Sequence, residues 1–173
     1  MPNWCSNTVV LKHTKDKIDQ LEYHLINNSE AGFFNFLRPR PPEQNENWYE
    51  WNIENWGTKW DANISTPADL HHDIERIDDE TLQVRFDTAW SPPIAFYDFL
   101  FEEGWDVTAK YYEPGMGFVG EYDNSIDDCW EYDLSDESTL EAIPTELREW
   151  FGIDEEFEFY KDNNEIEGED DVE

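Results

Sequence analysis

The sequence predicts an α+β fold in which two helices cover one face of an antiparallel sheet. Three observations favour this class: segments that alternate apolar and polar residues, segments with apolar residues at helical spacing, and the order in which these follow one another. The 173 residues fit one domain of ordinary size. Nine tryptophans, eight tyrosines and eleven phenylalanines can fill its core, because each ring removes a large area from water.

The first strand and the first helix are predicted at the N-terminus. A strand is expected in SNTVVLKH, where three strand formers are flanked by polar residues. A helix is expected in TKDKIDQLEYHLINN, with Thr14 as N-cap and an apolar face formed by Ile18, Leu21, Leu25 and Ile26. Regular structure stops at the proline-rich part of GFFNFLRPRPPEQNEN.

The central part predicts further strands and a second helix. The aromatic and β-branched stretch WYEWNIENWGTKWDAN is typical of a strand, a turn and a strand. The stretch TLQVRFDTAW alternates, with Leu82, Val84 and Phe86 on one face. A helix is expected in SPPIAFYDFLFEEG, where Ser91 can cap the start and Gly104 can end it. A strand follows in WDVTAKYY, and EPGMGFVGEY is expected to turn and continue as a strand. This order predicts a ferredoxin-like sandwich over residues 1–122, with a central aromatic insertion.

Four aromatic stretches of these 122 residues carry a family resemblance. They are MPNWCSN at the start, NWYEWNIENWGTKWD from Asn47, FDTAWSPP from Phe86 and YYEPGMGFVGEY from Tyr111. These motifs and their order resemble a YubB-type family of plasmid and bacteriophage proteins. The resemblance implies a ferredoxin-like domain and a mobile-element origin, and it implies no catalytic residue. The chain departs from the family pattern in its RPRPP loop and after Tyr122.

Negative charge is concentrated in the C-terminal third. Residues 121–173 carry a net charge of −20, and the first 120 residues carry −12. Residues 123–160 are predicted to be an acidic, partly helical extension, because apolar residues recur at spacings of three and four. A helix is expected from Thr145, after Pro144, with Gly152 at its end. Residues 161–173 have few apolar residues and are predicted to be a disordered acidic tail.

The formal net charge of −32 restricts the class of partner. Such a field repels nucleic acids and anionic membranes and attracts basic proteins. We therefore predict a non-enzymatic accessory protein that binds a basic protein, for example as a nucleic-acid-mimicking antagonist of a host defence system. The carboxylates assigned to this acidic face are Asp127, Asp128, Glu131, Asp136, Glu137, Glu155 and Glu156.

The stretch IENWGTKWD supports an alternative function. In that alternative a tryptophan-lined pocket binds a small flat ligand or a nucleotide, and the acidity serves only solubility. The residues assigned to the candidate pocket are Trp56, Lys59, Trp60, Asp61, Trp90 and Glu113. In the competing structural interpretation Gly57 makes a turn, Trp56 and Trp60 are buried, and Lys59 pairs with Asp61 or Asp87.

Neither a catalytic residue nor a metal or cofactor site is predicted. Cys5 and Cys129 are expected to be free thiols of a cytoplasmic protein in the host cell. The adjacent His71 and His72 show no defined ligand spacing. The sequence also contains neither a signal-peptide pattern nor an apolar stretch long enough for a membrane span.

Overall fold

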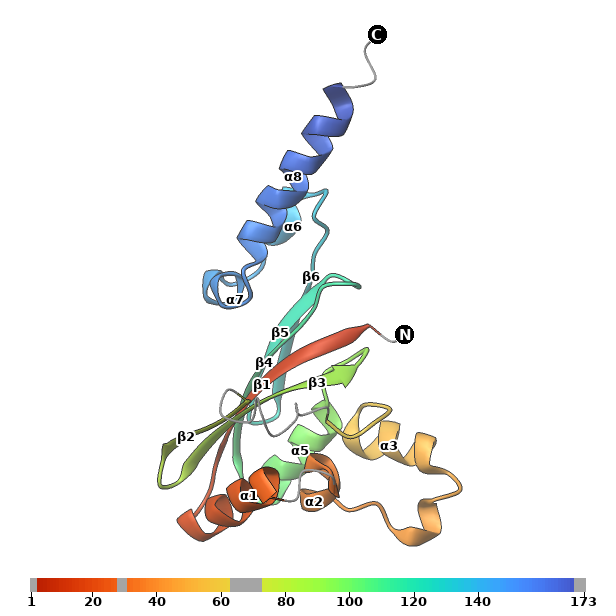
Figure 1. Cartoon of the computed structure of the whole chain (residues 1–173), viewed down its shortest axis with the longest axis vertical. Coiled ribbons are helices and arrows are strands. Elements are labelled where there is room, and N and C mark those ends of the chain that lie inside the picture. Colours follow the sequence, from red (N-terminus) through yellow and green to blue (C-terminus); the bar gives the residue numbers. More distant parts are fainter. Residues whose placement is uncertain (1–2, 28–30, 63–72, 170–173) are drawn as a thin grey trace.

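The computed structural model describes residues 3–27, 31–62 and 73–169, which form one six-stranded antiparallel sheet with helices packed on it (Figure 1). The elements in chain order are β1 (Trp4–Lys12), α1 (Lys15–Asn27), α2 (Phe33–Leu37), the 3-10 turn η2 (Pro42–Gln44), α3 (Trp48–Trp56), β2 (Ile74–Asp78), β3 (Thr81–Ala89), α5 (Ile94–Glu102), β4 (Asp106–Glu113), β5 (Phe118–Asp123), β6 (Ile126–Glu131), α6 (Glu137–Leu140), α7 (Thr145–Phe151) and α8 (Ile153–Glu169). The predicted α+β class is confirmed.

The strands lie in the order β2-β3-β1-β4-β5-β6, and each neighbouring pair is antiparallel. Alternate residues of a strand point to opposite faces. In β1 this places Val9 and Leu11 in the main core, together with Leu82 and Val84 of β3. Helices α1, α2, α3 and α5 contribute the other side of that core and cover one face of the sheet (Figure 1).

The segment expected to be a strand, a turn and a strand is instead helix α3, so that prediction was wrong. Asn52 and Trp56 are four residues apart, lie on one face of the helix and are both buried. Gly57 ends α3 with a φ of 81°, and its N–H donates to the carbonyl oxygens of Asn52 and Ile53. The left-handed glycine therefore acts as a helix C-cap and does not form a hairpin turn.

The start of α5 also differs from the prediction. The helix begins at Ile94 after Pro93 and has no side-chain cap. The Ser91 hydroxyl, predicted to be that cap, donates to the Gly57 carbonyl oxygen at 3.0 Å and so joins α5 to the end of α3. The helix ends at Glu102, and Gly104, which was predicted to end it, follows two residues later with a φ of 87° and donates its N–H to the Phe101 carbonyl oxygen.

The sheet continues beyond Tyr122, because β6 pairs with β5 along its whole length. After β6, helices α6, α7 and α8 form a second apolar cluster, in which Leu140 and Leu147 pack with Val119 of the sheet. Helix α7 begins at Thr145 and is capped by Gly152, as predicted.

Helix α8 projects away from the sheet and runs to Glu169 (Figure 1). Residues 161–169, predicted to belong to a disordered tail, are therefore helical, and residues 170–173 lie outside the described part. Within the described ranges, none of the helices combines the length and the apolar character needed to cross a bilayer.

Candidate partner-binding surfaces

The sheet face opposite α1 and α5 carries side chains in rows that cross the strands. One row consists of Arg85, Thr8, Lys110, Glu121 and Asp128, which lie in register on β3, β1, β4, β5 and β6. Its two basic residues lie on β3 and β4, and its two acidic residues lie on the edge pair β5 and β6. The row therefore has an acidic end at the edge of the sheet, which we call the acidic edge and define by Glu121 and Asp128.

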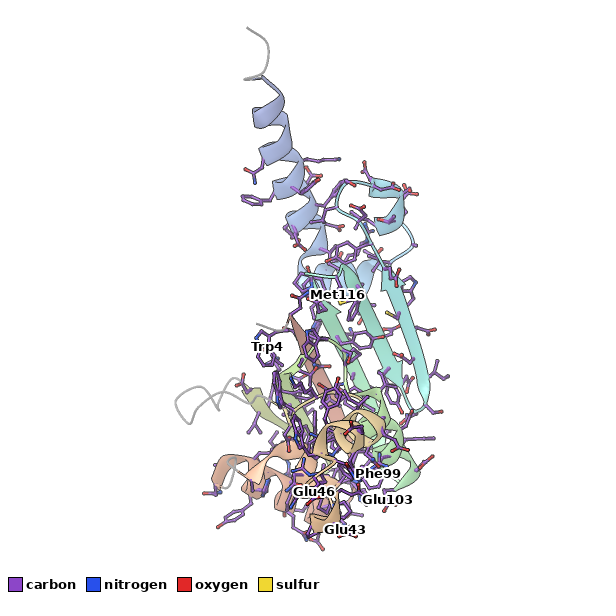
Figure 2. All side chains as sticks on the ribbon, turned by 90° about the vertical axis from the view of Figure 1, so that its right-hand side faces the viewer. Trp4, Glu43, Glu46, Phe99, Glu103 and Met116 are labelled. Carbon is purple, nitrogen blue, oxygen red and sulfur yellow. The ribbon has the colours of Figure 1, made fainter. Side chains whose placement is uncertain are left out.

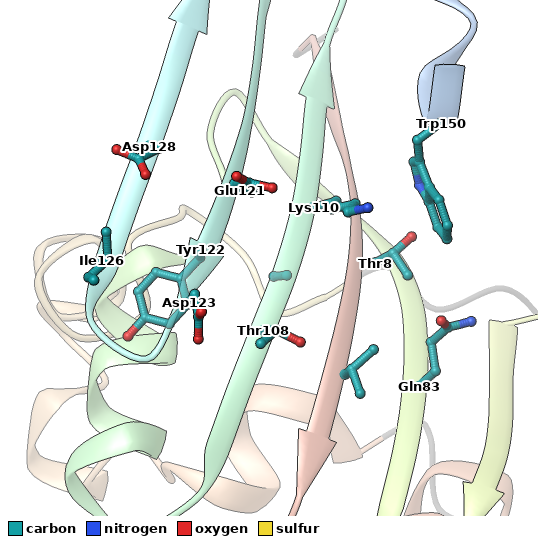
Figure 3. Close-up of a pocket in the computed structure, with 12 residues that line it drawn as sticks. Thr8, Gln83, Thr108, Lys110, Glu121, Tyr122, Asp123, Ile126, Asp128 and Trp150 are labelled. Carbon is teal, nitrogen blue, oxygen red and sulfur yellow. The ribbon is translucent and has the colours of Figure 1, made fainter. Parts of the chain in front are cut away.

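A hollow of about 440 Å³ lies on this face of the sheet. Figure 3 shows Trp150 of α7 standing over one side of the hollow, near Thr8 and Gln83, while the acidic edge and Asp123 form the other side. The hollow thus has an aromatic wall, a carboxylate wall and a floor of sheet residues. A ligand with both apolar and cationic parts fits such a lining.

Lys110 supplies the cation in this lining, and its ammonium already interacts with two residues of α7. Its ammonium forms an ion pair with Glu146 of α7 and lies 4.7 Å from the centroid of the Trp150 ring. The ion pair lowers the pKa of Glu146. These contacts hold α7 against the sheet, and Figure 3 shows the Lys110 side chain directed toward Trp150 and away from its cross-strand neighbour Glu121.

The acidic edge consequently has no cationic partner within the described residues. Glu121 and Asp128 are cross-strand neighbours, so their side chains start about 5 Å apart. Like charges in this position destabilise a sheet. A cation bound between the two strands would remove that repulsion.

The other carboxylates of the predicted acidic face are dispersed. Asp127 points to the opposite side of β6 from Asp128 and accepts a hydrogen bond from the Tyr111 hydroxyl at 2.8 Å. Its partial burial raises the pKa of this carboxyl. Glu131 also points to the opposite side of β6 from Asp128, because the two residues are three positions apart and side chains alternate along a strand.

Three more of these acids have structural contacts. Asp136 caps α6 by accepting from the Ser138 N–H at 3.0 Å. Glu137 lies 3.4 Å from the Lys161 ammonium nitrogen, and Glu156 accepts from the Tyr112 hydroxyl. Glu155 is exposed on α8. The structure therefore does not gather the seven predicted carboxylates on one surface.

Three members of the predicted tryptophan pocket stabilise the fold at separate places. The Trp56 side chain is 3% exposed, and its indole N–H donates to the Arg38 carbonyl oxygen. Glu113 is 1% exposed, and its carboxylate accepts from the N–H groups of Gly115 and Met116 in the loop after β4.

Asp61, the third of these, caps α2. Its carboxylate accepts from the N–H groups of Phe34 at 2.7 Å and Asn35 at 2.9 Å. Burial raises the pKa of this carboxyl, although the hydrogen bonds from the backbone oppose that effect.

The other three members of the predicted pocket meet at the surface. The Trp60 and Trp90 rings are stacked at 6.1 Å between centroids, and the Lys59 ammonium lies 4.4 Å from the Trp60 centroid. Trp60 is 39% exposed, so the prediction that it is buried was wrong. The structural interpretation predicted that Lys59 pairs with Asp61 or Asp87. Its ammonium contacts aromatic rings instead.

Trp4 and Tyr49 complete this group, and the sequence reasoning missed both. The Trp4 ring lies 6.3 Å from that of Trp60, and the Tyr49 ring lies 6.0 Å from the Lys59 ammonium. Trp4 lies at the end of the sheet that is marked by Met116, away from Phe99 and Glu103 (Figure 2). Only the strand register, in which Trp4 pairs with Ala89, the residue before Trp90, brings Trp4 to this group.

Neither thiol has the character of a nucleophile. Cys5 is buried, and burial raises its pKa to about 12, so the thiolate is scarce at neutral pH. Cys129 is exposed, but partial burial of its sulfur also raises its pKa. Across the described ranges, the His, Cys, Asp and Glu side chains form no group of three or more that could hold a metal ion. His71 and His72 lie outside these ranges.

Comparisons with known proteins give one distant likeness. No family model matches the chain, and no curated protein matches it. A crystal structure of protein api92 from Yersinia pseudotuberculosis, of the family DUF1281, is 12% identical with a TM-score of 0.38, over 77% of this chain and 99% of that one. A likeness at this level assigns no function.

Proposed function

We propose that this chain is a non-enzymatic accessory protein of the YubB type, encoded by a mobile element, that binds a basic protein in the host cytoplasm. The order of elements β1-α1-β2-β3-α5-β4 and the strand order β2-β3-β1-β4 support a ferredoxin-like core within this proposal. Strands β5 and β6 extend that core at one edge and supply the acidic edge.

The observation that carries the proposal is the acidic edge itself. Two carboxylates lie opposite each other on neighbouring strands, beside a hollow, while the ammonium of Lys110, the cross-strand neighbour of Glu121, belongs to an ion pair with Glu146. This arrangement costs stability in the free protein, and a lysine or arginine side chain from a partner would relieve the cost.

The remaining charge favours a partner that normally binds nucleic acid. Residues 121–173 carry −20, so a basic groove built for DNA or RNA would be attracted over a longer range than the hollow alone provides. We therefore propose a host nucleic-acid-binding or defence protein as the partner, and a mimic of nucleic acid as the mode of binding.

The test is a charge reversal at the acidic edge. The immobilised chain is first exposed to a bacterial host lysate at low salt, and a retained protein is purified and titrated. The double variant Glu121→Lys/Asp128→Lys should lower the association rate for that protein by at least about tenfold, because opposite charges steer the encounter.

The matched control is Glu158→Lys/Asp162→Lys, which changes the net charge equally at exposed positions of α8. This control should change the rate by less than about threefold. Higher salt should weaken binding of the wild type. The proposal is contradicted if neither the acidic-edge variant nor higher salt weakens binding, provided that circular dichroism shows both variants folded.

A further inference from the structure

We propose that a second, separate surface binds a planar aromatic molecule that carries one anionic group. This surface consists of Trp4, Trp60 and Trp90 together with Lys59, and we call it the tryptophan cluster. It is independent of the acidic edge, and the chemistry it recognises has the opposite charge.

The tryptophan cluster brings three distant segments together at the surface. Trp4 comes from β1, Trp60 from the segment after α3, and Trp90 from the end of β3. The three indole side chains are each about 40% exposed, and neighbouring centroids are 6.1–6.3 Å apart. Exposed aromatic groups gathered in this way mark an interaction site. A planar ring can stack on such indoles, and this stacking stabilises a bound ligand.

Trp90 adopts an unfavourable backbone conformation. Its φ is 66°, in the left-handed region that residues with a side chain rarely adopt. The Trp90 N–H donates to the Asn3 carbonyl oxygen at 3.0 Å, which fixes this conformation beside β1. Backbone strain of this kind concentrates at binding sites. Here it turns the indole of Trp90 onto that of Trp60.

Lys59 is an uncommitted cation in a chain with a large excess of acids. The chain has 43 acidic and 11 basic residues, yet within the described ranges the Lys59 ammonium has no carboxylate partner. Its neighbours are the rings of Trp60 and Trp90, at 4.4 and 5.4 Å from the centroids. The nearest acid in the chain, Asp61, is used by α2. Lys59 can therefore pair with an anionic group while the attached ring stacks on an indole.

The charge of the whole chain limits how many anionic groups such a ligand carries. Nucleic-acid polymers are repelled by the net charge of −32, whereas a single anionic group needs only the local ammonium. A cationic ligand is disfavoured at this surface because Lys59 already lies over the faces of two of the rings. These charges select a small aromatic anion.

The test follows the tryptophan indole N–H signals in ¹H–¹⁵N NMR spectra of the full chain. The probes are indole-3-acetate and adenosine monophosphate, and the uncharged counterparts are indole-3-acetamide and adenosine. At least one anionic probe should shift the signals of Trp4, Trp60 and Trp90, and bind at least threefold more tightly than its counterpart. The proposal is overturned if neither anion shifts these signals at up to about 10 mM, which is well above the millimolar Kd expected of one stacked ring and one ion pair.

Three variants separate a specific site from general aromatic adsorption. Trp60→Ala should weaken the anionic probe by at least about fivefold, because it removes one stacking surface. Lys59→Met should reduce binding of the anion to that of its uncharged counterpart. Phe159→Ala is the control, since this ring is 70% exposed on α8 and belongs to neither candidate surface, and it should leave binding unchanged. Equal weakening by Trp60→Ala and Phe159→Ala, or a Lys59→Met variant that keeps the preference for the anion, contradicts the proposal.

Discussion

At the scale of single residues, Trp56 and Trp60 show how differently two nearby tryptophans can be used. Trp56 is the last residue of α3 and packs against Phe34 and Trp51, with centroid distances of 5.8 and 5.4 Å. Trp60 lies beyond Gly57 and stacks on Trp90 at the surface. One ring belongs to the core that supports the insertion, and the other is available to a ligand.

We therefore expect the two tryptophans to differ in their effect on stability. Trp56→Ala should lower the free energy of unfolding by about 3–5 kcal/mol, because it leaves a cavity and an unpaired Arg38 carbonyl oxygen. Trp60→Ala should change it by less than about 1 kcal/mol, as for other surface positions. Urea unfolding followed by circular dichroism measures both. Equal losses for the two variants would contradict this assignment.

At the scale of elements, the insertion between α1 and β2 is held together by side chains from distant positions. Helix α2 has five residues and no cap of its own, and Asp61 accepts from its first N–H groups. Gly32 permits this approach, since a Cβ at that position would lie 2.1 Å from the Asp61 carboxylate. Asn52 of α3 donates to the Lys59 carbonyl oxygen at 2.8 Å and fixes the segment that carries Lys59 and Trp60.

This arrangement predicts a large loss of stability when Asp61, which was assigned to the candidate pocket, is substituted. Asp61→Ala should lower the free energy of unfolding by about 1–3 kcal/mol, because two N–H groups of α2 lose their acceptor. Asp162→Ala, at an exposed position of α8, is the control and should have no measurable effect. Thermal unfolding at neutral pH compares the two. A melting temperature unchanged by Asp61→Ala would show that α2 does not need this cap.

At the scale of the whole molecule, the two faces of the sheet have different coverings. Helices α1, α2, α3 and α5 cover one face, and the C-terminal helices contact part of the other face, near Tyr112 and Val119 and at Lys110 (Figure 1). The rest of that second face carries the hollow and the acidic edge. The exposed edge strand β6 is acidic, and such charges also oppose pairing with another sheet.

The net charge predicts how salt affects the stability of the whole chain. With 43 acidic and 11 basic residues, repulsion between carboxylates outweighs attraction within the few surface ion pairs. Raising the salt concentration from about 0.01 to 0.5 M shortens the Debye length from about 30 to 4 Å and should raise the melting temperature. Differential scanning calorimetry at several sodium chloride concentrations measures this. A falling melting temperature would show that the ion pairs contribute more than the repulsion costs.

Periodicity in the sequence was enough to predict α1, β3, α5 and α7, because the spacing of apolar residues fixes which face of an element is buried. Composition was enough to predict the acidic C-terminal third. The identity of α3 was not predictable in this way, because its aromatic residues favour strands and only packing on α5 and the core selects the helix.

The sites depended on tertiary structure for a further reason. Local spacing tells which residues share a face, but it does not tell what covers that face or which distant segment lies beside it. Asp127 and Asp128 are adjacent and equally acidic, yet one accepts from Tyr111 and the other borders the hollow. Likewise, Trp4 reaches Trp60 only because β1 pairs with β3 and the chain after α3 returns to that end of the sheet. The sequence by itself determined α1, β3, α5, α7 and the charge, whereas the pairing of strands decided which acids and which rings stand together.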